Sequence, residues 1–330
     1  GLDPHAPRTP LGHVKDAVLR AKLHVDRGLD RAAALYVEPH RRRAVVRELN
    51  FELCGACNLR CTWCSLDSRL RPGFMDVALF ERVLDEIADA RRFDVKVLNL
   101  HHSGDILLHP RLDAFLAAIA RRKRAGPFPH VNALTSATHL RGDRVDWLLE
   151  HDAIDWLRFS VDGGNPRDFE AIRVGARWER VVGNIHAFLD EAERRGRSIR
   201  TGIIAVFGTA QPEIAPEFRD LVARVTNYMP RLPHDWVGKA DLDLPADSDT
   251  PSAGAAPRGL CRFVLAQTVV LHDGRVTLCC NDLNAEGVIG DLAERSLYEI
   301  FRGPERRAVI DAMRRERRAD LAFCGTCTQA

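Results

Sequence analysis

Four cysteines lie within eleven residues, in the stretch CGACNLRCTWC, at Cys54, Cys57, Cys61 and Cys64. Such a density of thiols is typical of a disulfide cluster, a zinc site or an iron–sulfur site. Two zinc knuckles would be separated by only three residues here, which is too few for two hairpins to converge on one ion. A ferredoxin run would end in Cys-Pro, which is absent. The pattern that remains is Cys57-x3-Cys61-x2-Cys64.

The elements that must position these thiols alternate between strands and helices. We expect strands over 45–53, 95–100, 131–135, 154–161, 199–207 and 235–242. We expect helices over 76–90, 110–124, 144–150, 178–193 and 216–228, after one or two basic helices within 11–43. The alternation predicts an α/β fold of parallel βα units, either a doubly wound sheet or an open barrel.

Polar residues follow three of the expected strands. The cysteine loop follows the first, His101 to Asp105 the second and Ser160 to Gly164 the fourth. Ligands of parallel βα folds gather at the carboxyl ends of the strands, so these segments should share one site. His101, His102, Lys239 and Asp241 are further candidates for polar contacts there, from their strand-end positions alone.

A Pro/Ala/Ser/Gly linker at 245–259 separates a second unit. There the Asp273-Gly274 pair predicts a hairpin between strands at 266–271 and 275–279, and helices should follow over 296–302 and on through 318. Four cysteines bracket these elements, Cys261, Cys279, Cys324 and Cys327. Their thiols suit a structural zinc or an iron–sulfur cluster.

Composition narrows the class of protein. The chain has 330 residues, 45% of them apolar, with a formal net charge of +2, which argues against a nucleic-acid-binding surface over the whole molecule. The arginine runs are expected on solvated helical faces. No apolar run is long enough for a membrane span, and the N-terminus lacks a signal peptide's apolar core, so we expect a cytoplasmic protein. Its nine cysteines should then be thiols or metal ligands.

The spacing Cys57-x3-Cys61-x2-Cys64, with CNLRC and the aromatic Trp63, resembles the signature of the radical S-adenosylmethionine (SAM) enzymes. This resemblance implies a partial (βα)6 barrel and a [4Fe-4S] cluster on three thiolates, whose open iron chelates SAM. An electron from the cluster then cleaves SAM to a 5′-deoxyadenosyl radical, which removes a substrate hydrogen atom. An electron donor such as flavodoxin or ferredoxin is implied as a partner.

The resemblance also implies the residues that contact SAM. Ser103-Gly104-Asp105 occupies the slot of the family's Gly-Gly-Glu, with a carboxylate one methylene shorter. Ser160 and Asp162 match polar positions near the ribose or methionine, and Arg173 resembles an arginine that pairs with the SAM carboxylate. Thr135-Ser136-Ala137 departs from the Thr-Asn-Gly that relatives often show.

The spacing of the C-terminal cysteines resembles that of the twitch domain, a shortened SPASM domain. It implies one auxiliary [4Fe-4S] cluster ligated by Cys261, Cys279, Cys324 and Cys327. We therefore expect an N-terminal extension at 1–44, a barrel at 45–244, a linker at 245–259 and this domain at 260–330. Cys54 is expected to be a buried spare thiol.

Three reaction classes remain open. Two of them, epimerisation and dehydrogenation, act on a small carbohydrate-type substrate, and the third modifies a peptide. Cys280 resembles the cysteine with which radical SAM epimerases of aminoglycoside and nucleoside pathways return a hydrogen atom, although a bystander thiol is equally open. The auxiliary spacing resembles aminocyclitol dehydrogenases, in which that cluster would take an electron. Peptide modification is disfavoured because the residues before the barrel are too few and too helical for a peptide-recognition domain. We favour epimerisation over dehydrogenation.

Overall fold

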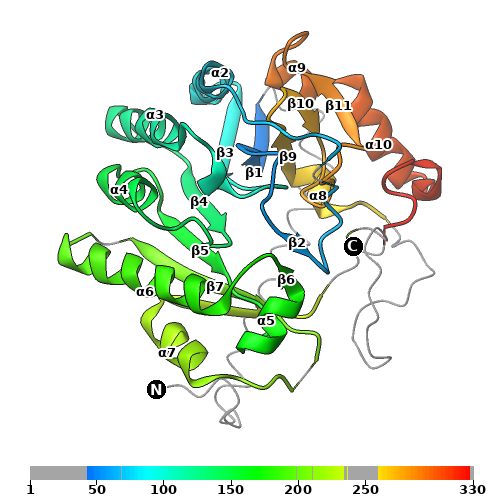
Figure 1. Cartoon of the computed structure of the whole chain (residues 1–330). Coiled ribbons are helices and arrows are strands. Elements are labelled where there is room, and N and C mark those ends of the chain that lie inside the picture. The colour runs from blue at the N-terminus through cyan, green and yellow to red at the C-terminus, as the bar shows by residue number, and fades with distance from the viewer. Residues whose placement is uncertain are drawn as a thin grey trace, which may run out of the picture.

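The structure is a computed structural model that describes residues 43–67, 69–197, 199–209, 211–233, 236 and 259–327. Within these residues most strands form one curved sheet, in the order β11-β10-β9-β1-β3-β4-β5-β7-β8 (Figure 1). In chain order its strands are β1 (Ala44–Phe51), β3 (Phe93–Asn99), β4 (His130–Thr135), β5 (Trp156–Ser160), β7 (Arg200–Val206), β8 (Asn227–Arg231), β9 (Gln267–Val270), β10 (Arg275–Thr277) and β11 (Val288–Asp291).

Helices cover the outer side of this sheet along the barrel strands, as Figure 1 shows. In chain order the helices are α2 (Val77–Ala88), η1 (Ile106–Leu108), α3 (Leu112–Ala125), α4 (Asp143–Glu150), α5 (Pro166–Ile172), α6 (Trp178–Arg194), α7 (Pro216–Arg224), α8 (Arg262–Ala266), α9 (Leu297–Phe301), α10 (Pro304–Arg314) and η2 (Arg318–Asp320). Helix α2 is representative: Asp76 caps it by accepting from the Ala78 backbone N–H, and Phe80, Val83, Leu84 and Ile87 bury one face.

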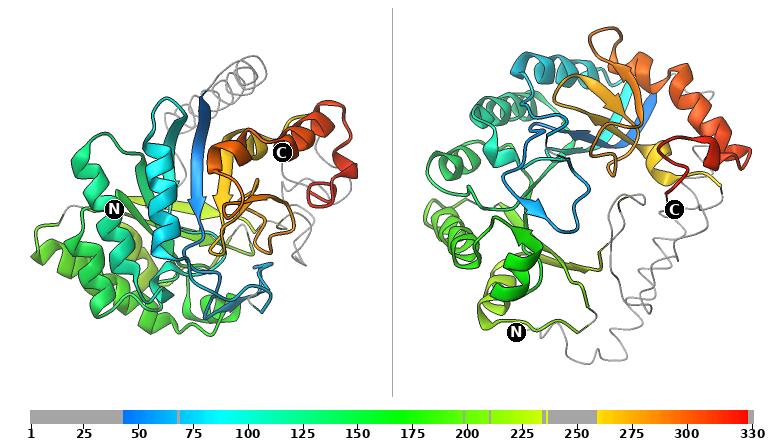
Figure 2. Two further views of the ribbon diagram at one scale, coloured as in Figure 1. Left: turned by 90° about the horizontal axis from the view of Figure 1, so that it is seen from above. Right: turned by 45° about the vertical axis from the view of Figure 1, so that its right-hand side comes forward.

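The expected α/β fold is confirmed. Strands β1, β3, β4, β5, β7 and β8 pair in parallel with their neighbours, each connection carrying a helix. The sheet curves into an open partial barrel, which the turned views make visible (Figure 2). Parallel strands need such crossovers, and their carboxyl ends therefore meet at one rim.

The expected helix over 216–228 is wrong at its C-terminal end. Helix α7 ends at Arg224, and β8 begins at Asn227, paired with β7 from Gly202↔Asn227 to Val206↔Arg231. The β-branched pair Val225-Thr226 favours extended backbone, and pairing with an exposed strand edge outweighs helix propensity there. The strand expected at 235–242 lies outside the described residues except for Trp236, which is in a turn.

The C-terminal hairpin is confirmed and has an unexpected neighbour. Strands β9 and β10 are antiparallel, and Gly274 in their turn has φ +92°, which suits glycine. Strand β9 also runs parallel to β1, from Glu48↔Gln267 to Phe51↔Val270. The C-terminal segment thus continues the barrel sheet at its first strand, which places the hairpin turn beside the cysteine loop.

Other expectations have mixed outcomes. The helices after Ser296 are present as α9 and α10. Helices α5 and α8, strand β11, and a small sheet of β2 (Arg60–Cys61) with β6 (Arg173–Val174) were not expected. The basic helices within 11–43 and most of the linker at 245–259 lie outside the described residues. Among the helices described, none combines the length and the apolar character that a membrane crossing requires.

Candidate functional site

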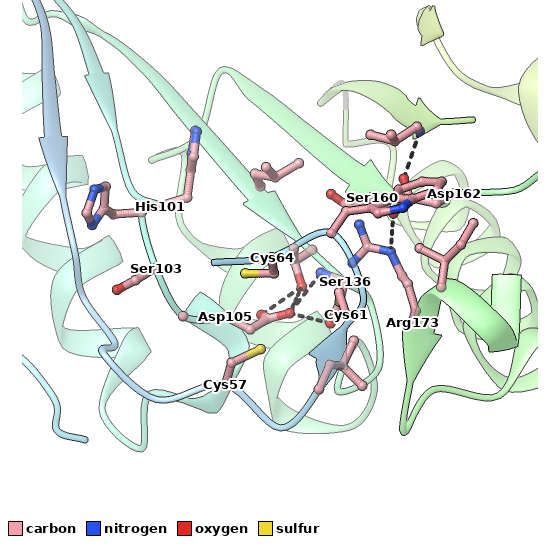
Figure 3. A pocket seen from close by; sticks show the side chains of 18 of the residues that line it. Cys57, Cys61, Cys64, His101, Ser103, Asp105, Ser136, Ser160, Asp162 and Arg173 are labelled. Carbon is pink, nitrogen blue, oxygen red and sulfur yellow. Dashed lines mark hydrogen bonds and ion pairs between the residues drawn. The ribbon is translucent and has the colours of Figure 1, made fainter. Parts of the chain in front are cut away.

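The residues expected to form a site line one cavity at the carboxyl ends of the barrel strands. Its volume is ≈ 190 Å³ (Figure 3). The predicted residues that line it are Cys57, Cys61, Trp63, Cys64, Ser103, Gly104, Asp105, Ser160, Asp162 and Arg173. His101 and His102 also line it, whereas Lys239 and Asp241 lie outside the described residues.

The cysteine loop is shaped by two close backbone contacts. Strand β2 pairs with β6 so that Cys61 lies opposite Arg173, and the Thr62 N–H donates to the Ile172 carbonyl at 2.9 Å. Gly104 packs directly against the loop, because a Cβ there would lie 2.2 Å from the carbonyl oxygens of Cys54 and Ala56. These contacts bring segments that are far apart in sequence to the three thiols.

Cys54 stands apart from the other three thiols. Its side chain is buried, and its Sγ donates to the Ala56 carbonyl oxygen at 3.1 Å. Burial raises the pKa of Cys54 to about 12. This geometry is consistent with a spare thiol.

Cys57, Cys61 and Cys64 face a cationic neighbour. Burial raises the pKa of all three thiols, and the Arg173 guanidinium opposes that effect at each of them. Arg173 is itself oriented by Asp162, whose carboxylate accepts from its Nε at 2.8 Å and from the Val206 N–H at 2.8 Å. Figure 3 shows this pair beside the three thiols.

Asp105 is buried and is held in place by hydrogen bonds within the protein. Its carboxylate accepts from the backbone N–H groups of Leu107 and Ser136, at 2.9 and 2.8 Å, and from the Thr135 and Ser136 hydroxyls. The Thr135-Ser136-Ala137 segment, which departs from the family pattern, therefore holds the shorter Asp105 carboxylate in place through its hydroxyls and one backbone N–H.

The C-terminal cysteines also converge. Cys279, Cys324 and Cys327 pack around Phe323. Burial, together with the nearby thiols of Cys279, Cys261 and Cys327, raises the pKa of Cys324 to about 12. The chain thus brings together four thiols that are separated by as many as 66 positions. Cys280 is half-buried, and among the described residues it does not belong to the lining of the cavity.

Sequence reasoning missed Glu52, a buried carboxylate directly after β1. It contacts Arg71, His102 and His272. The available signal was one acidic residue between the apolar Phe51 and Leu53 at the end of an expected strand. Its partners lie as far as 220 positions away, so the sequence alone could not identify them.

The donor set suits iron–sulfur chemistry at both places. Within the described residues, no three Cys, His, Asp or Glu side chains converge as ligands of a single ion would. A cubane cluster holds its ligand sulfurs apart at separate corners, so thiols that surround a common space without meeting at one point suit it. Three thiols around an open cavity, and four thiols near one another in the C-terminal unit, match a site with a free coordination position and a site without one.

Comparisons with known proteins agree with this geometry. The family model for the Radical SAM superfamily matches residues 51–215, and the model for an iron–sulfur cluster-binding domain, SPASM, matches residues 261–328. No curated protein matches the chain.

Several solved structures share the fold. The complex of BtrN with AdoMet and 2-DOIA has a TM-score of 0.57 at 17% identity, covering 86% of this chain and 94% of that one. Streptococcus suis SuiB bound to precursor peptide SuiA has a TM-score of 0.66 at 14% identity, covering 99% and 78%. The anSMEcpe structure with bound AdoMet has a TM-score of 0.59 at 13% identity, covering 86% and 85%. At such identities the likeness concerns the fold.

Proposed function

The chain belongs to the radical SAM superfamily and carries a SPASM-type domain, so its cofactors are SAM and [4Fe-4S] clusters. On this premise we propose that it epimerises a carbon of a small sugar, aminocyclitol or nucleoside in natural-product biosynthesis. One observation carries the proposal: the Cys57, Cys61 and Cys64 thiols share a cavity with Asp105 and Arg173. The division into a barrel at 45–244 and a cluster domain at 260–330 is part of it.

We assign the three thiols of the cavity to the SAM-binding cluster. SAM bound to that cluster, when it is reduced, supplies the 5′-deoxyadenosyl radical that abstracts hydrogen. Arg173 uses Nε for Asp162 in the described structure, so its Nη groups can meet the SAM carboxylate. Asp105 would take the SAM amino group. Trp63, Ser103, Gly104, Ser160 and Asp162 complete the proposed contacts.

Cys261, Cys279, Cys324 and Cys327 would ligate the auxiliary cluster. A cluster with four thiolate ligands leaves no position for substrate, so it exchanges electrons. In the proposed reaction the Cys280 thiol gives a hydrogen atom to the substrate carbon radical from the face opposite to abstraction. The thiyl radical that remains would have to take up one electron and one proton, and the auxiliary cluster held by the four C-terminal cysteines would supply that electron.

The loop that carries Cys280 lies against the cysteine loop, which supports this assignment. The Asn284 side chain donates to the Ser65 carbonyl at 2.9 Å and accepts from the Asp67 N–H at 3.0 Å. Ser65 directly follows Cys64, so the two loops are in contact. Cys280 nevertheless lies outside the lining of the cavity, among the described residues, and a substrate would have to extend toward it.

Dehydrogenation of a secondary alcohol is the second candidate. In it the substrate radical would lose one electron and its hydroxyl proton to give a ketone, and the auxiliary cluster held by the four C-terminal cysteines would accept that electron. The four converging C-terminal thiols fit either route. BtrN, the fold neighbour bound to AdoMet and 2-DOIA, is consistent with a small-molecule substrate. Peptide modification is a lesser candidate, supported by the peptide complexes of SuiB and anSMEcpe.

Replacing Cys280 tests the reaction type. With a panel of aminocyclitols and aminoglycosides, Cys280→Ala should still transfer substrate deuterium to 5′-deoxyadenosine, but inverted product should fall at least about 100-fold, because the hydrogen donor is gone. Product analysis by mass spectrometry and chiral chromatography measures both. Cys54→Ala is the matched control and should turn over as wild type.

Deuterated water gives an independent readout. An epimerase should place one solvent deuterium on the inverted carbon, because the thiol proton exchanges with solvent. A ketone product without solvent deuterium would replace the proposal by dehydrogenation. Unchanged formation of the wild-type inverted product by Cys280→Ala would eliminate Cys280 as the donor.

A further inference from the structure

Glu52 is a buried carboxylate to which the proposed function gives no role. It follows β1 directly, and its side chain is 0% exposed. Both its oxygens accept from Arg71, at 2.9 Å from Nη1 and 2.9 Å from Nη2. Oε1 also meets Nδ1 of His272 at 2.7 Å, and Oε2 meets Nδ1 of His102 at 3.1 Å and accepts from the Ser103 hydroxyl.

These contacts keep Glu52 ionised. Burial alone would raise the pKa of Glu52, but hydrogen bonds from His102, His272 and Arg71 lower it well below its ordinary value. An ionised carboxylate only accepts, so each imidazole must carry its proton on Nδ1. One side chain thereby fixes the orientation of two histidine rings and one guanidinium.

The partners of Glu52 come from three separate parts of the fold. Arg71 lies in the loop that follows Cys64, and His102 and Ser103 lie directly before Gly104-Asp105 at the end of β3. His272 lies in the turn between β9 and β10, in the C-terminal domain. One carboxylate therefore joins the cysteine loop, the strand end that lines the cavity, and the C-terminal domain.

The imidazole of His272 occupies a slot between two glycines of the cysteine-loop region. A Cβ on Gly55 would lie 2.6 Å from Nδ1, and a Cβ on Gly73 would lie 2.5 Å from Nε2. Neither glycine has a positive φ, so close neighbours, and not backbone conformation, exclude a side chain: the ring at Gly73, and the ring together with the Arg71 carbonyl oxygen at Gly55. The Gly55 N–H donates to the Gly73 carbonyl at 2.9 Å, which closes the base of the slot.

Arg71 also binds a loop of the C-terminal domain. Its Nη2 donates to the Leu283 carbonyl at 2.9 Å, next to Asn284, which bonds the residues after Cys64. The loop from Cys279 to Asn284 is thus held to the cysteine loop through Arg71 and Asn284. The position of this loop relative to the cysteine loop therefore depends on where Glu52 holds the Arg71 guanidinium.

We propose that Glu52 is a positioning residue that, through Arg71 and the inserted ring of His272, holds the Cys57–Cys64 loop at a fixed separation from the Cys279–Asn284 loop. The inference rests on the proposed function, in which these loops carry the two clusters. A separation set by a buried charge network varies little, because every donor would lose a partner in the low-dielectric interior if it moved. Hydrogen return and electron exchange both depend on that separation.

The test uses His272→Ala in the protein loaded with both clusters. Iron content and SAM binding should remain, because His272 is not a proposed ligand. Amide hydrogen exchange should rise about tenfold in the peptides that contain Gly55, Arg71 and Asn284, since a charged hydrogen bond is lost. The electron paramagnetic resonance spectrum of the reduced protein should show altered spin coupling between the clusters. His272→Asn should restore both properties, because its amide nitrogen can occupy the place of Nδ1.

Glu86→Gln is the matched control for the contact between barrel and C-terminal domain. The Glu86 carboxylate of α2 accepts from the Leu297 and Tyr298 N–H groups at 2.9 and 2.7 Å, and it lies on an element that does not line the cavity. This variant should raise exchange around α9 and leave the cysteine-loop peptides and the spin coupling as in wild type.

Wild-type exchange and spin coupling in His272→Ala would overturn the inference, as would equal effects from Glu86→Gln or no rescue by His272→Asn. If His272→Ala does not fold, Gly73→Ala replaces it. The three nearest atoms to its methyl group all belong to the His272 ring, so the methyl group displaces the ring without removing a polar group, and the same tenfold rise is expected. A wild-type protein that binds neither iron nor SAM would instead contradict the proposed function.

Discussion

At the scale of single residues, the chemistry is set by what each side chain faces. The four thiols of one loop differ in their surroundings. Cys54 is buried and donates to the Ala56 carbonyl oxygen, whereas Cys57, Cys61 and Cys64 line a cavity beside Arg173. Asp105 stands where the family pattern has a glutamate, and Thr135 and Ser136 hold its shorter carboxylate in place by hydrogen bonds. Residue type alone describes neither outcome, since both depend on neighbours.

Glu52 makes a prediction at this scale about acid stability. Its pKa is lowered in the folded protein from the ordinary 4.5, so its contribution to the free energy of unfolding is complete above about pH 4.5. That contribution is lost as the pH falls from 4.5 toward the folded value. The stability difference between wild type and Glu52→Gln should therefore be largest at neutral pH and shrink below pH 4.5. Denaturant unfolding at several pH values measures it, and a constant difference would contradict the ion network.

At the scale of elements, connections between distant strands decide the site. The two-residue sheet of β2 with β6 brings Arg173 opposite Cys61, and the pairing of β9 with β1 brings His272 beside Glu52. Neither pairing has a local signal, because two-residue strands lack periodicity and β9 reads only as half of a hairpin. The same limitation explains why the sequence predicts a helix that runs past Arg224 into β8.

Within the C-terminal elements, Arg306 should be the most sensitive cation. It is buried, lies 3.8 Å from the Phe301 ring centroid, and donates to the Leu265 carbonyl at 3.0 Å. Arg306→Leu should lower the free energy of unfolding by about 2–3 kcal/mol, because buried carbonyls lose their donor. The neighbouring Arg307 is exposed, and Arg307→Leu should change the free energy of unfolding by less than about 0.5 kcal/mol. Thermal unfolding of both variants tests this, and equal losses would refute it.

At the scale of the whole molecule, one sheet continues from the barrel into the C-terminal domain, within the described residues. The main core extends along it and includes Val270, Ile300 and Phe301. The segment with Cys279, Cys324 and Cys327 instead packs around Phe323 in a small separate cluster. Little apolar contact therefore holds the segment around Cys324 and Cys327, and metal ligation would supply the remaining stabilisation of its fold.

Removal of iron should therefore raise amide hydrogen exchange more in the C-terminal domain than in the barrel. After anaerobic chelation, amide exchange should rise at least about tenfold around Cys279 and Cys324, while strands β3 to β7 remain protected, because apolar packing holds them. Mass spectrometry of exchanged peptides gives the comparison. Uniform loss of protection across the barrel at the same chelator concentration would show that the sheet depends on iron throughout.

The sequence by itself determined the parallel βα order, the hairpin at Asp273-Gly274 and the division of the cysteines into two groups. These features are encoded by local signals, namely periodicity, a turn dipeptide and ligand spacing. Only the tertiary structure decided that Thr135 and Ser136 hold Asp105, and that Glu52 binds His272 across 220 positions. Such contacts arise from strand order and close backbone approach, so no short stretch of sequence contains them.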